Sequence, residues 1–535
     1  MSMRSLEWIT AILLSMVVAV LLFVRAQHAG ALWRDECASL QLAEMPRAGD
    51  VLNNFQRESF PAPFPLTVRA YAAIYGTSDA ALRAFGFVVG LMLLAAVWIN
   101  ARLLKTGPPL LLLILLGLNT TFLVWGTGIR AYGIGSVLIL LAFGLVAKML
   151  VEPTNFRIAG AFLACLASVQ FLLYNSVLLV AIGFAGFVVC LTQKNIRAGI
   201  ALAGICGLCA IAMLPYLGPF RYESQSTVVF RAPVDLAWFT GQLALALGNP
   251  TIVMVTLWLV LFLAALAGAI LRLYFFRSKK PAPEWGYLLY GLLVAVVSAV
   301  LYLAFLKAVG YRTRAWYYLA LLAVVAGSID LLVANLAQVR WVRIARLALV
   351  VGAFCGLPWA AWPKINERQS NMDIVARTLT EAAQPNDLIV VNPWFLGVGF
   401  NWYYRGTTPW TTCPLLDDHR MHRFDLLKEK MATTGPIDDV LGKISRTMRS
   451  GNRVWFVGEL TILPPDRMAV TLPPAPSSEY GWSGDAYAQT WSQQMGDLVR
   501  DHAGHAQVVP VPGLQSQSVN EFEDVPVFVA SGWRD

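Results

Sequence analysis

Residues 8–24 read WITAILLSMVVAVLLFV, a stretch of seventeen residues without a charged side chain. The hydrocarbon core of a bilayer is crossed by a helix of about 20 mainly apolar residues, with a range that includes this length. Similar stretches recur along the chain as far as Trp362 and then stop. The sequence therefore predicts an α-helical polytopic membrane protein that ends in a soluble domain.

Eleven apolar stretches are long enough to be counted as membrane spans. The predicted spans are Trp8–Val24, Leu82–Ile99, Leu110–Trp125, Tyr132–Leu150, Ile158–Leu173, Val177–Leu191, Ile200–Leu217, Ile252–Leu271, Tyr287–Phe305, Trp316–Val333 and Leu347–Trp362. They assign residues 1–362 to a membrane domain, whose first outer loop covers residues 25–81, and residues 363–535 to a soluble domain.

Composition and charge support this division. Hydrophobic residues make up 57% of the 535 residues and charged residues 14%, and the mean hydropathy is +0.59, which is too apolar for a soluble protein of this length. The Lys and Arg residues that produce the net charge of +9 gather in the short loops on one side of the predicted spans. Such loops stay in the cytoplasm, so we expect an inner amino terminus, an outer carboxyl-terminal domain and no nucleic-acid partner.

The soluble domain has the pattern of an α/β fold. Helical stretches are predicted at Met372–Ala383 and Ile437–Met448, and each precedes a short apolar run, Leu388–Val391 or Val454–Val457. Val525–Val529 has the composition of a last strand.

The outer loops carry charged residues that the topology alone does not require. Their charged and aromatic members include Arg34, Asp35, Glu36, Glu58, Arg130, Tyr132, Arg221, Glu223, Lys307, Tyr311, Arg312 and Arg314. Carboxylates near clustered arginines are typical of a site that binds a phosphorylated ligand and performs acid–base chemistry. The alternative for any single arginine is that it reaches the interface and pairs with a lipid phosphate.

Several of these segments resemble motifs of a known family. Leu32–Ser39, which follows the first span, resembles the acidic signature of the GT-C polyprenyl-phosphate-dependent glycosyltransferases, the group that includes protein O-mannosyltransferases and the lipid A aminoarabinose and galacturonic acid transferases. Pro61–Leu66 followed by Tyr75–Arg83, the Arg-x-Tyr at Arg130–Tyr132 and the cluster Tyr311–Tyr317 are similar to further motifs of this family.

The chain also departs from the family pattern. It lacks the family's His-Pro-Pro in the first loop, and Gly128 stands where a Glu often precedes the Arg of Arg-x-Tyr. A second acidic group, if one is needed, would have to be Glu36, Glu58 or Glu223.

The resemblance implies a membrane glycosyltransferase that moves a sugar from a polyprenyl phosphate to a membrane-proximal acceptor hydroxyl in a lipid, glycan or protein. It places the enzyme in the cell envelope, in the inner (plasma) membrane of a bacterium, with a periplasmic soluble domain, and it implies inversion at the anomeric carbon with Asp35 as general base. It implies a catalytic group of Asp35 and Glu36, a donor-phosphate group of Arg130, Tyr132, Lys307, Tyr311, Arg312 and Arg314, and acceptor or loop support from Arg34, Glu58, Arg83, Arg221 and Glu223.

The sequence is also compatible with one alternative function, and it contains residues that bear on metal binding. A transporter or flippase for a lipid-linked or anionic substrate is the alternative. The sequence has no nucleotide-binding P-loop, which argues against a pump driven by ATP. We expect no cofactor, and a divalent metal is the less favoured option because the outer arginines already supply positive charge. The pairs His419/His422 and His502/His505 contain the residue type that binds zinc, but surface histidines are the simpler interpretation.

Overall fold

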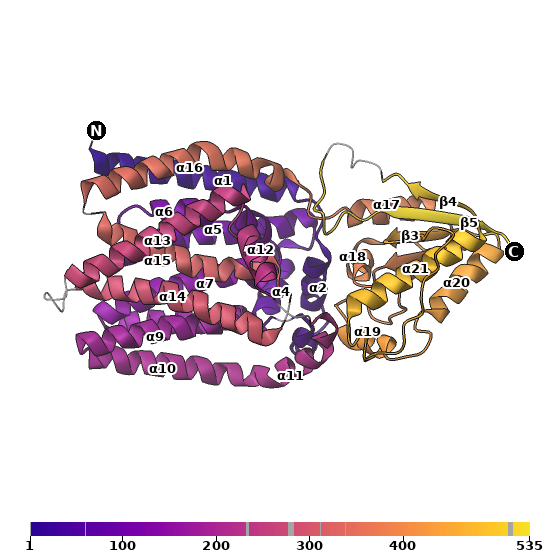
Figure 1. Cartoon of the computed structure of the whole chain (residues 1–535), viewed down its shortest axis with the longest axis horizontal. Coiled ribbons are helices and arrows are strands. Elements are labelled where there is room, and N and C mark those ends of the chain that lie inside the picture. Colours follow the sequence, from indigo (N-terminus) through magenta and orange to yellow (C-terminus); the bar gives the residue numbers. More distant parts are fainter. Residues whose placement is uncertain are drawn as a thin grey trace.

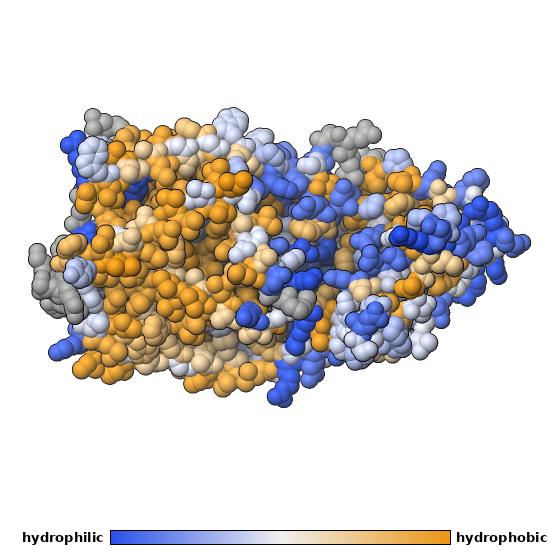
Figure 2. Space-filling model, in the orientation of Figure 1, coloured by the Kyte–Doolittle hydropathy of each residue, from blue (hydrophilic) through white to orange (hydrophobic). Residues whose placement is uncertain are grey.

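The computed structural model describes residues 2–58, 60–231, 235–275, 283–310, 312–337, 339–511 and 517–535. They form a bundle of long helices and a smaller α/β domain, which lie end to end along the long axis of the molecule (Figure 1). Apolar side chains dominate the visible surface of the bundle, whereas hydrophilic ones gather toward the α/β domain (Figure 2). This distribution is that of a multi-pass membrane protein with a soluble carboxyl-terminal domain.

Within the described ranges, nine helical segments are long and apolar enough to cross a membrane. They are α1 (Met3–His28), α5 (Asp79–Leu104), α7 (Ala131–Val151), α9 (Asn175–Gln193), α10 (Ile196–Met213) with its continuation to Phe230, α13 (Thr251–Phe275), α14 (Pro283–Val309), α15 (Leu319–Leu336) and α16 (Arg340–Asn366). Each contains one of the predicted spans, except that the span Trp316–Val333 begins in the 3-10 turn before α15. The boundary predicted at residue 362 lies inside α16, which continues to Asn366.

Two predicted spans differ from regular long helices. Ile158–Leu173 corresponds to α8 (Asn155–Phe171), which has 17 residues. Leu110–Trp125 is divided into α6 (Leu110–Leu112) and two π-helical turns, η2 (Leu113–Gly117) and η3 (Phe122–Gly126). The buried Asn119 amide supports the break, because it donates to the carbonyls of Ala246 and Leu247 at 3.0 Å each. A broken helix is tolerated at this depth because protein surrounds it.

The α/β domain contains a five-stranded sheet in the order β2-β1-β3-β5-β4. The strands are β1 (Leu388–Asn392), β2 (Trp410–Thr412), β3 (Val454–Gly458), β4 (Ala503–Val509) and β5 (Val527–Trp533). The first three are parallel, and β5 is antiparallel to both of its neighbours. The predicted strands correspond to β1, β3 and the region of β5, whereas β2 and the mostly exposed edge strand β4 were not predicted.

Helices cover both faces of this sheet. On one face, α17 (Met372–Ala382) and α18 (Leu396–Tyr403) pack against alternate residues of β1 and β3. On the other face lie α19 (Phe424–Met431), α20 (Asp438–Arg449) and α21 (Gly484–His502). The alternation follows from the pleat of the strands, which sends successive side chains to opposite faces.

Short elements join the two domains. The first outer loop contains α2 (Arg34–Ala43), α3 (Ala48–Asn54), η1 (Phe55–Glu58) and α4 (Pro63–Tyr75), and α2 packs directly against α18. Between the later spans, α11 (Leu217–Ser226) packs against η1, and α12 (Leu236–Ala246) packs against η7 (Ala315–Tyr318). The candidate site is built where these elements meet the α/β domain.

Candidate active site

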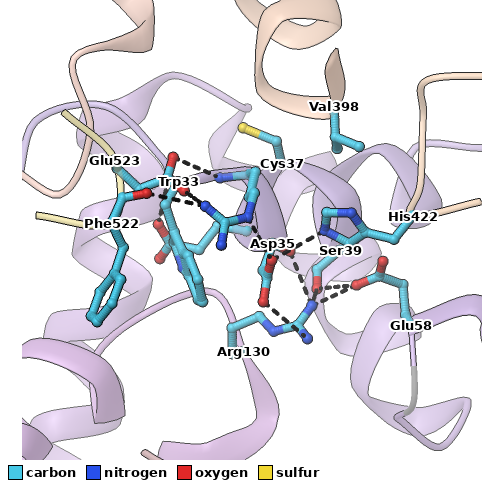
Figure 3. Close-up of polar contacts among 12 residues, drawn as sticks. Trp33, Asp35, Cys37, Ser39, Glu58, Arg130, Val398, His422, Phe522 and Glu523 are labelled. Carbon is cyan, nitrogen blue, oxygen red and sulfur yellow. Dashed lines mark hydrogen bonds and ion pairs between the residues drawn. The ribbon is translucent and has the colours of Figure 1, made fainter. Parts of the chain in front are cut away.

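Asp35 lies near the start of α2, between the membrane bundle and the α/β domain (Figure 3). Its Oδ1 is 3.1 Å from Nε2 of His422, and its Oδ2 is 3.8 Å from Nη2 of Arg130. The side chain of Asp35 is 22% exposed, so it remains accessible to a ligand. The structure therefore brings two of the predicted site residues, Asp35 and Arg130, to one place.

The charge state of Asp35 results from opposing effects. Burial raises the pKa of Asp35, but the hydrogen bond with His422 and the positive charges of Arg130 and Arg34 together lower it below the usual value for aspartate. Asp35 is therefore ionised at neutral pH, and its carboxylate oxygens act as hydrogen-bond acceptors.

Arg130 precedes α7 and connects Asp35 to Glu58. Its Nη1 donates to Oε2 of Glu58 at 2.5 Å, to Oγ of Ser39 at 2.9 Å and to the backbone carbonyl of Asp35 at 3.0 Å. The guanidinium also lies over the ring of Phe60, 4.3 Å from its centroid. Arg130 is thus held at several points beside Asp35.

Glu58 is the second carboxylate that the structure places near this centre. Its side chain is buried, and Ser39 donates a hydrogen bond to its Oε2 at 3.1 Å. Burial raises the pKa of Glu58 above its usual value, although the positive charge of Arg130 opposes the shift. Oε1 of Glu58 and Nε of Arg130 have no hydrogen-bond partner among the described residues.

Glu36 adjoins Asp35 in the sequence but has different surroundings. It is fully buried, and its carboxylate accepts hydrogen bonds from Nη1 of Arg83 at 2.9 Å and from the backbone N–H groups of Trp33 and Ile129 at 3.1 and 2.8 Å. Arg83 in turn donates to the carbonyls of Gly30 and Ala31. These contacts fix the loop that presents Asp35, rather than leaving Glu36 open to a ligand.

The position of Glu36 also explains the glycine at residue 128. A Cβ atom added to Gly128 would lie 2.9 Å from Oε1 of Glu36. The space beside the Arg-x-Tyr motif is therefore already filled by a carboxylate from the first outer loop, which leaves no room for a side chain at residue 128.

Arg312 and Arg314 form an exposed basic rim near the aromatic part of the site. Both guanidiniums lie over the ring of Trp238, at 5.4 and 5.8 Å from its centroid, and Arg314 also lies 5.1 Å from the ring of Phe522. Stacking uses the faces of the guanidiniums. Their N–H edges are the part that can bind an anion.

The other predicted site residues lie in varied settings. Tyr132 is buried, with its ring 5.4 Å from those of Phe60 and Tyr317. Lys307 is exposed near the end of α14, and Arg221 is exposed on α11. Tyr311 lies outside the described residues.

An aromatic cavity of about 360 Å³ adjoins this site. Its lining includes Phe60, which contacts Arg130, and Tyr317, which contacts Tyr132. Bundle residues such as Tyr174 and Phe305 line other parts, and Phe424 comes from the α/β domain. Glu223, predicted as a support residue, also lines it.

The α/β domain contributes site residues that were not predicted. His422 contacts Asp35, and Glu523 forms an ion pair with Arg34. Phe522 lies near Trp125 and Trp316, with ring centroids 6.4 and 6.1 Å apart. No sequence pattern indicates these contacts, because 387 positions separate His422 from Asp35.

The histidines whose residue type could bind zinc lie in different environments. His419 packs on Trp410 and His502 packs on Trp533, with ring centroids 4.6 and 4.4 Å apart. Their partners at 422 and 505 differ as well, since His422 faces Asp35 and His505 is exposed on β4. Within the part of the chain that the structure describes, no three His, Cys, Asp or Glu side chains converge in a way that could hold a metal ion.

Comparisons with known proteins place this architecture in a fold class. No protein-family model matches the chain, and no curated protein matches it. A solved structure with this fold is that of ArnT from Cupriavidus metallidurans bound to undecaprenyl phosphate. It is 10% identical, with a TM-score of 0.50, over 84% of this chain and 92% of that chain. A structural likeness at this low sequence identity shows the fold alone, so the activity has to be argued from the site.

Proposed function

We propose that the protein is a membrane glycosyltransferase that moves a sugar from a polyprenyl phosphate to an acceptor hydroxyl. The observation that carries this proposal is the placement of Asp35, an accessible carboxylate beside Arg130, next to an aromatic cavity at one end of a membrane bundle. The solved ArnT structure, which has the same fold, holds undecaprenyl phosphate. A polyprenyl chain requires an apolar cavity of this kind, and its phosphate requires cationic partners.

The donor would lie with its isoprenoid chain toward the cavity and its phosphate toward Arg130, Arg312 and Arg314. Asp35 accepts the proton of the acceptor hydroxyl, whose oxygen attacks the anomeric carbon from the side opposite the phosphate. The bond from that carbon to the phosphate oxygen breaks, and its electron pair leaves with the polyprenyl phosphate. One displacement of this kind inverts the anomeric centre.

Donor binding also strengthens Asp35 as a base. In the unliganded site, Arg130 and its neighbours lower the pKa of Asp35 and so weaken its affinity for a proton. A phosphate beside Arg130 brings a negative charge that offsets this effect. Proton transfer is therefore favoured once the donor is bound, which couples the two substrates.

The carboxylates have separate roles in this proposal. Asp35 is the base, and Glu58 orients Arg130 through the bond to Nη1. Glu36 holds the loop through Arg83. No step requires a metal ion, because arginines supply the charge that stabilises the leaving phosphate.

We further propose that the site faces away from the cytoplasm of a bacterial plasma membrane. α5 and α7 begin at the site, so Arg102 and Lys148 in their last turns lie at the far end of the bundle. Basic residues mark the cytoplasmic side. A reporter that is active only in the cytoplasm should be silent when fused after Asp535, and a bright fusion would reverse this orientation.

Product analysis tests the activity directly. Purified protein in detergent, supplied with undecaprenyl-phosphate-linked sugars and a lipid extract as acceptor, should release free undecaprenyl phosphate only when the acceptor is present. A transporter or flippase would release none with any donor, and that result would reject the proposed function. Donor hydrolysis without acceptor would instead indicate a hydrolase.

A further inference from the structure

A loop of the α/β domain brings His422 to the reacting carboxylate. We propose that His422 is a positioning residue of the transfer reaction, which holds Oδ1 of Asp35 and leaves Oδ2 to take the proton of the acceptor. This inference rests on the proposed function, since it assigns a role within that same site. It makes the soluble domain a part of the catalytic centre rather than an accessory to it.

Packing fixes the position of the His422 ring. The ring packs against both Trp394 and Phe424, with centroid distances of 6.1 and 5.8 Å, and the His422 side chain is only 11% exposed. Arg423 anchors the same loop through ion pairs with Asp418 at 3.1 Å and Asp425 at 2.8 Å. A side chain that is immobilised in this way can set the geometry of its partner.

The chemistry of the two groups decides the direction of the hydrogen bond. An ionised carboxylate only accepts, so Nε2 of His422 has to carry the hydrogen that lies toward Oδ1 of Asp35. Oδ2 is the oxygen nearer to Arg130, where we place the donor phosphate. Figure 3 draws the contact between His422 and Asp35. In the transfer step the acceptor's proton moves to Oδ2, while the bond between His422 and Oδ1 stays intact.

Two substitutions separate positioning from packing. His422→Gln retains an N–H donor but cannot carry a charge, and His422→Leu removes the donor. We expect His422→Leu to lower kcat by about a hundredfold, as for the misplacement of a reacting group by about 1 Å, with the KM for the donor unchanged. His422→Gln should keep most of the wild-type kcat, because its amide N–H can still donate to Asp35.

One further variant serves as the control for the loss of a histidine. His419→Gln removes a histidine of the same segment that packs on Trp410, and it should behave as the wild type.

The measurement is release of undecaprenyl phosphate by each variant, with kcat and the donor KM determined separately. Wild-type kcat in His422→Leu, or a loss of kcat in His422→Gln as large as that in His422→Leu, would overturn the inference. If His422→Leu does not fold, a loss of kcat by about a hundredfold in His422→Gln overturns it. A wild type that releases no product overturns the proposed function, and this inference with it.

Discussion

Glu36 and Arg83 form a buried ion pair, with Oε1 and Nη1 2.9 Å apart, that ties α2 to α5 next to Asp35. Both side chains are less than a tenth exposed, so neither charge can be solvated if the other is removed. The pair holds the turn from which Asp35 projects, because Arg83 also binds the carbonyls of Gly30 and Ala31.

Removal of one partner of this pair should therefore lower the stability of the protein more than removal of a surface charge does. We expect Arg83→Met to destabilise the protein by about 3–5 kcal/mol, the typical cost of an uncompensated buried charge. Thermal unfolding in detergent measures this, with the exposed Arg102→Met as the matched control. Equal melting temperatures for the two variants would show that the pair has no structural role.

The raised pKa of Glu523 predicts that the stability of the protein depends on pH. Its pKa is raised to about 7 by burial, against the opposing charge of Arg34, so the folded state binds the proton more tightly than the unfolded state does. The stabilisation is complete below the usual pKa of glutamate, about 4.3, and is lost as the pH rises through about 7. The loss should be on the order of 1–3 kcal/mol.

Melting temperatures of the wild type and Glu523→Gln between these pH values check this prediction. The glutamine cannot ionise, so the decline with pH should be shallower in the variant. Parallel curves would assign the decline to other groups.

The basic rim predicts where the donor phosphate binds. Arg312→Ala combined with Arg314→Ala should raise the KM for the donor by about tenfold or more, since each charge-assisted hydrogen bond contributes roughly 1.5–3 kcal/mol. Arg102→Ala, at the opposite end of the bundle, is the control for general loss of charge. If both proteins show the same KM, the phosphate must lie elsewhere.

Chelation tests whether a metal takes part in the transfer. With arginines next to the leaving group, we expect turnover to survive exhaustive removal of divalent cations. The assay compares initial rates before and after treatment with a chelator. Loss of activity that manganese or magnesium restores would contradict a site that relies on arginines alone.

The general fold could be predicted because lipid imposes a simple rule on the sequence. A segment such as Thr251–Phe275 has to be apolar over a bilayer's thickness, and this length is visible in the sequence. The break in Leu110–Trp125 was not visible, because it depends on what Asn119 binds in a distant segment. Short β2 and exposed β4 likewise lack the apolar run that identifies β1.

The site could be predicted only in part. Asp35 and Arg130 were expected at one interface because both follow or precede predicted spans. Successive residues of an α-helix point about 100° apart, so Asp35 and Glu36 could not both face the same ligand. This difference in direction could be predicted from the sequence. The contacts of His422 and Glu523 could not be predicted, because they depend on how the soluble domain packs against the bundle.

The proposed reaction depends above all on Asp35, which takes the proton of the acceptor. Asp35→Asn preserves the shape of the side chain but lacks the basic oxygen, and proton transfer by a positioned group contributes typically about 100- to 10,000-fold to the rate. We therefore predict that Asp35→Asn binds the polyprenyl-linked donor with wild-type affinity and loses turnover by a factor of this size, whereas the exposed Asp466→Asn keeps full activity. Near-normal release of polyprenyl phosphate by Asp35→Asn would contradict the assignment of Asp35 as the base.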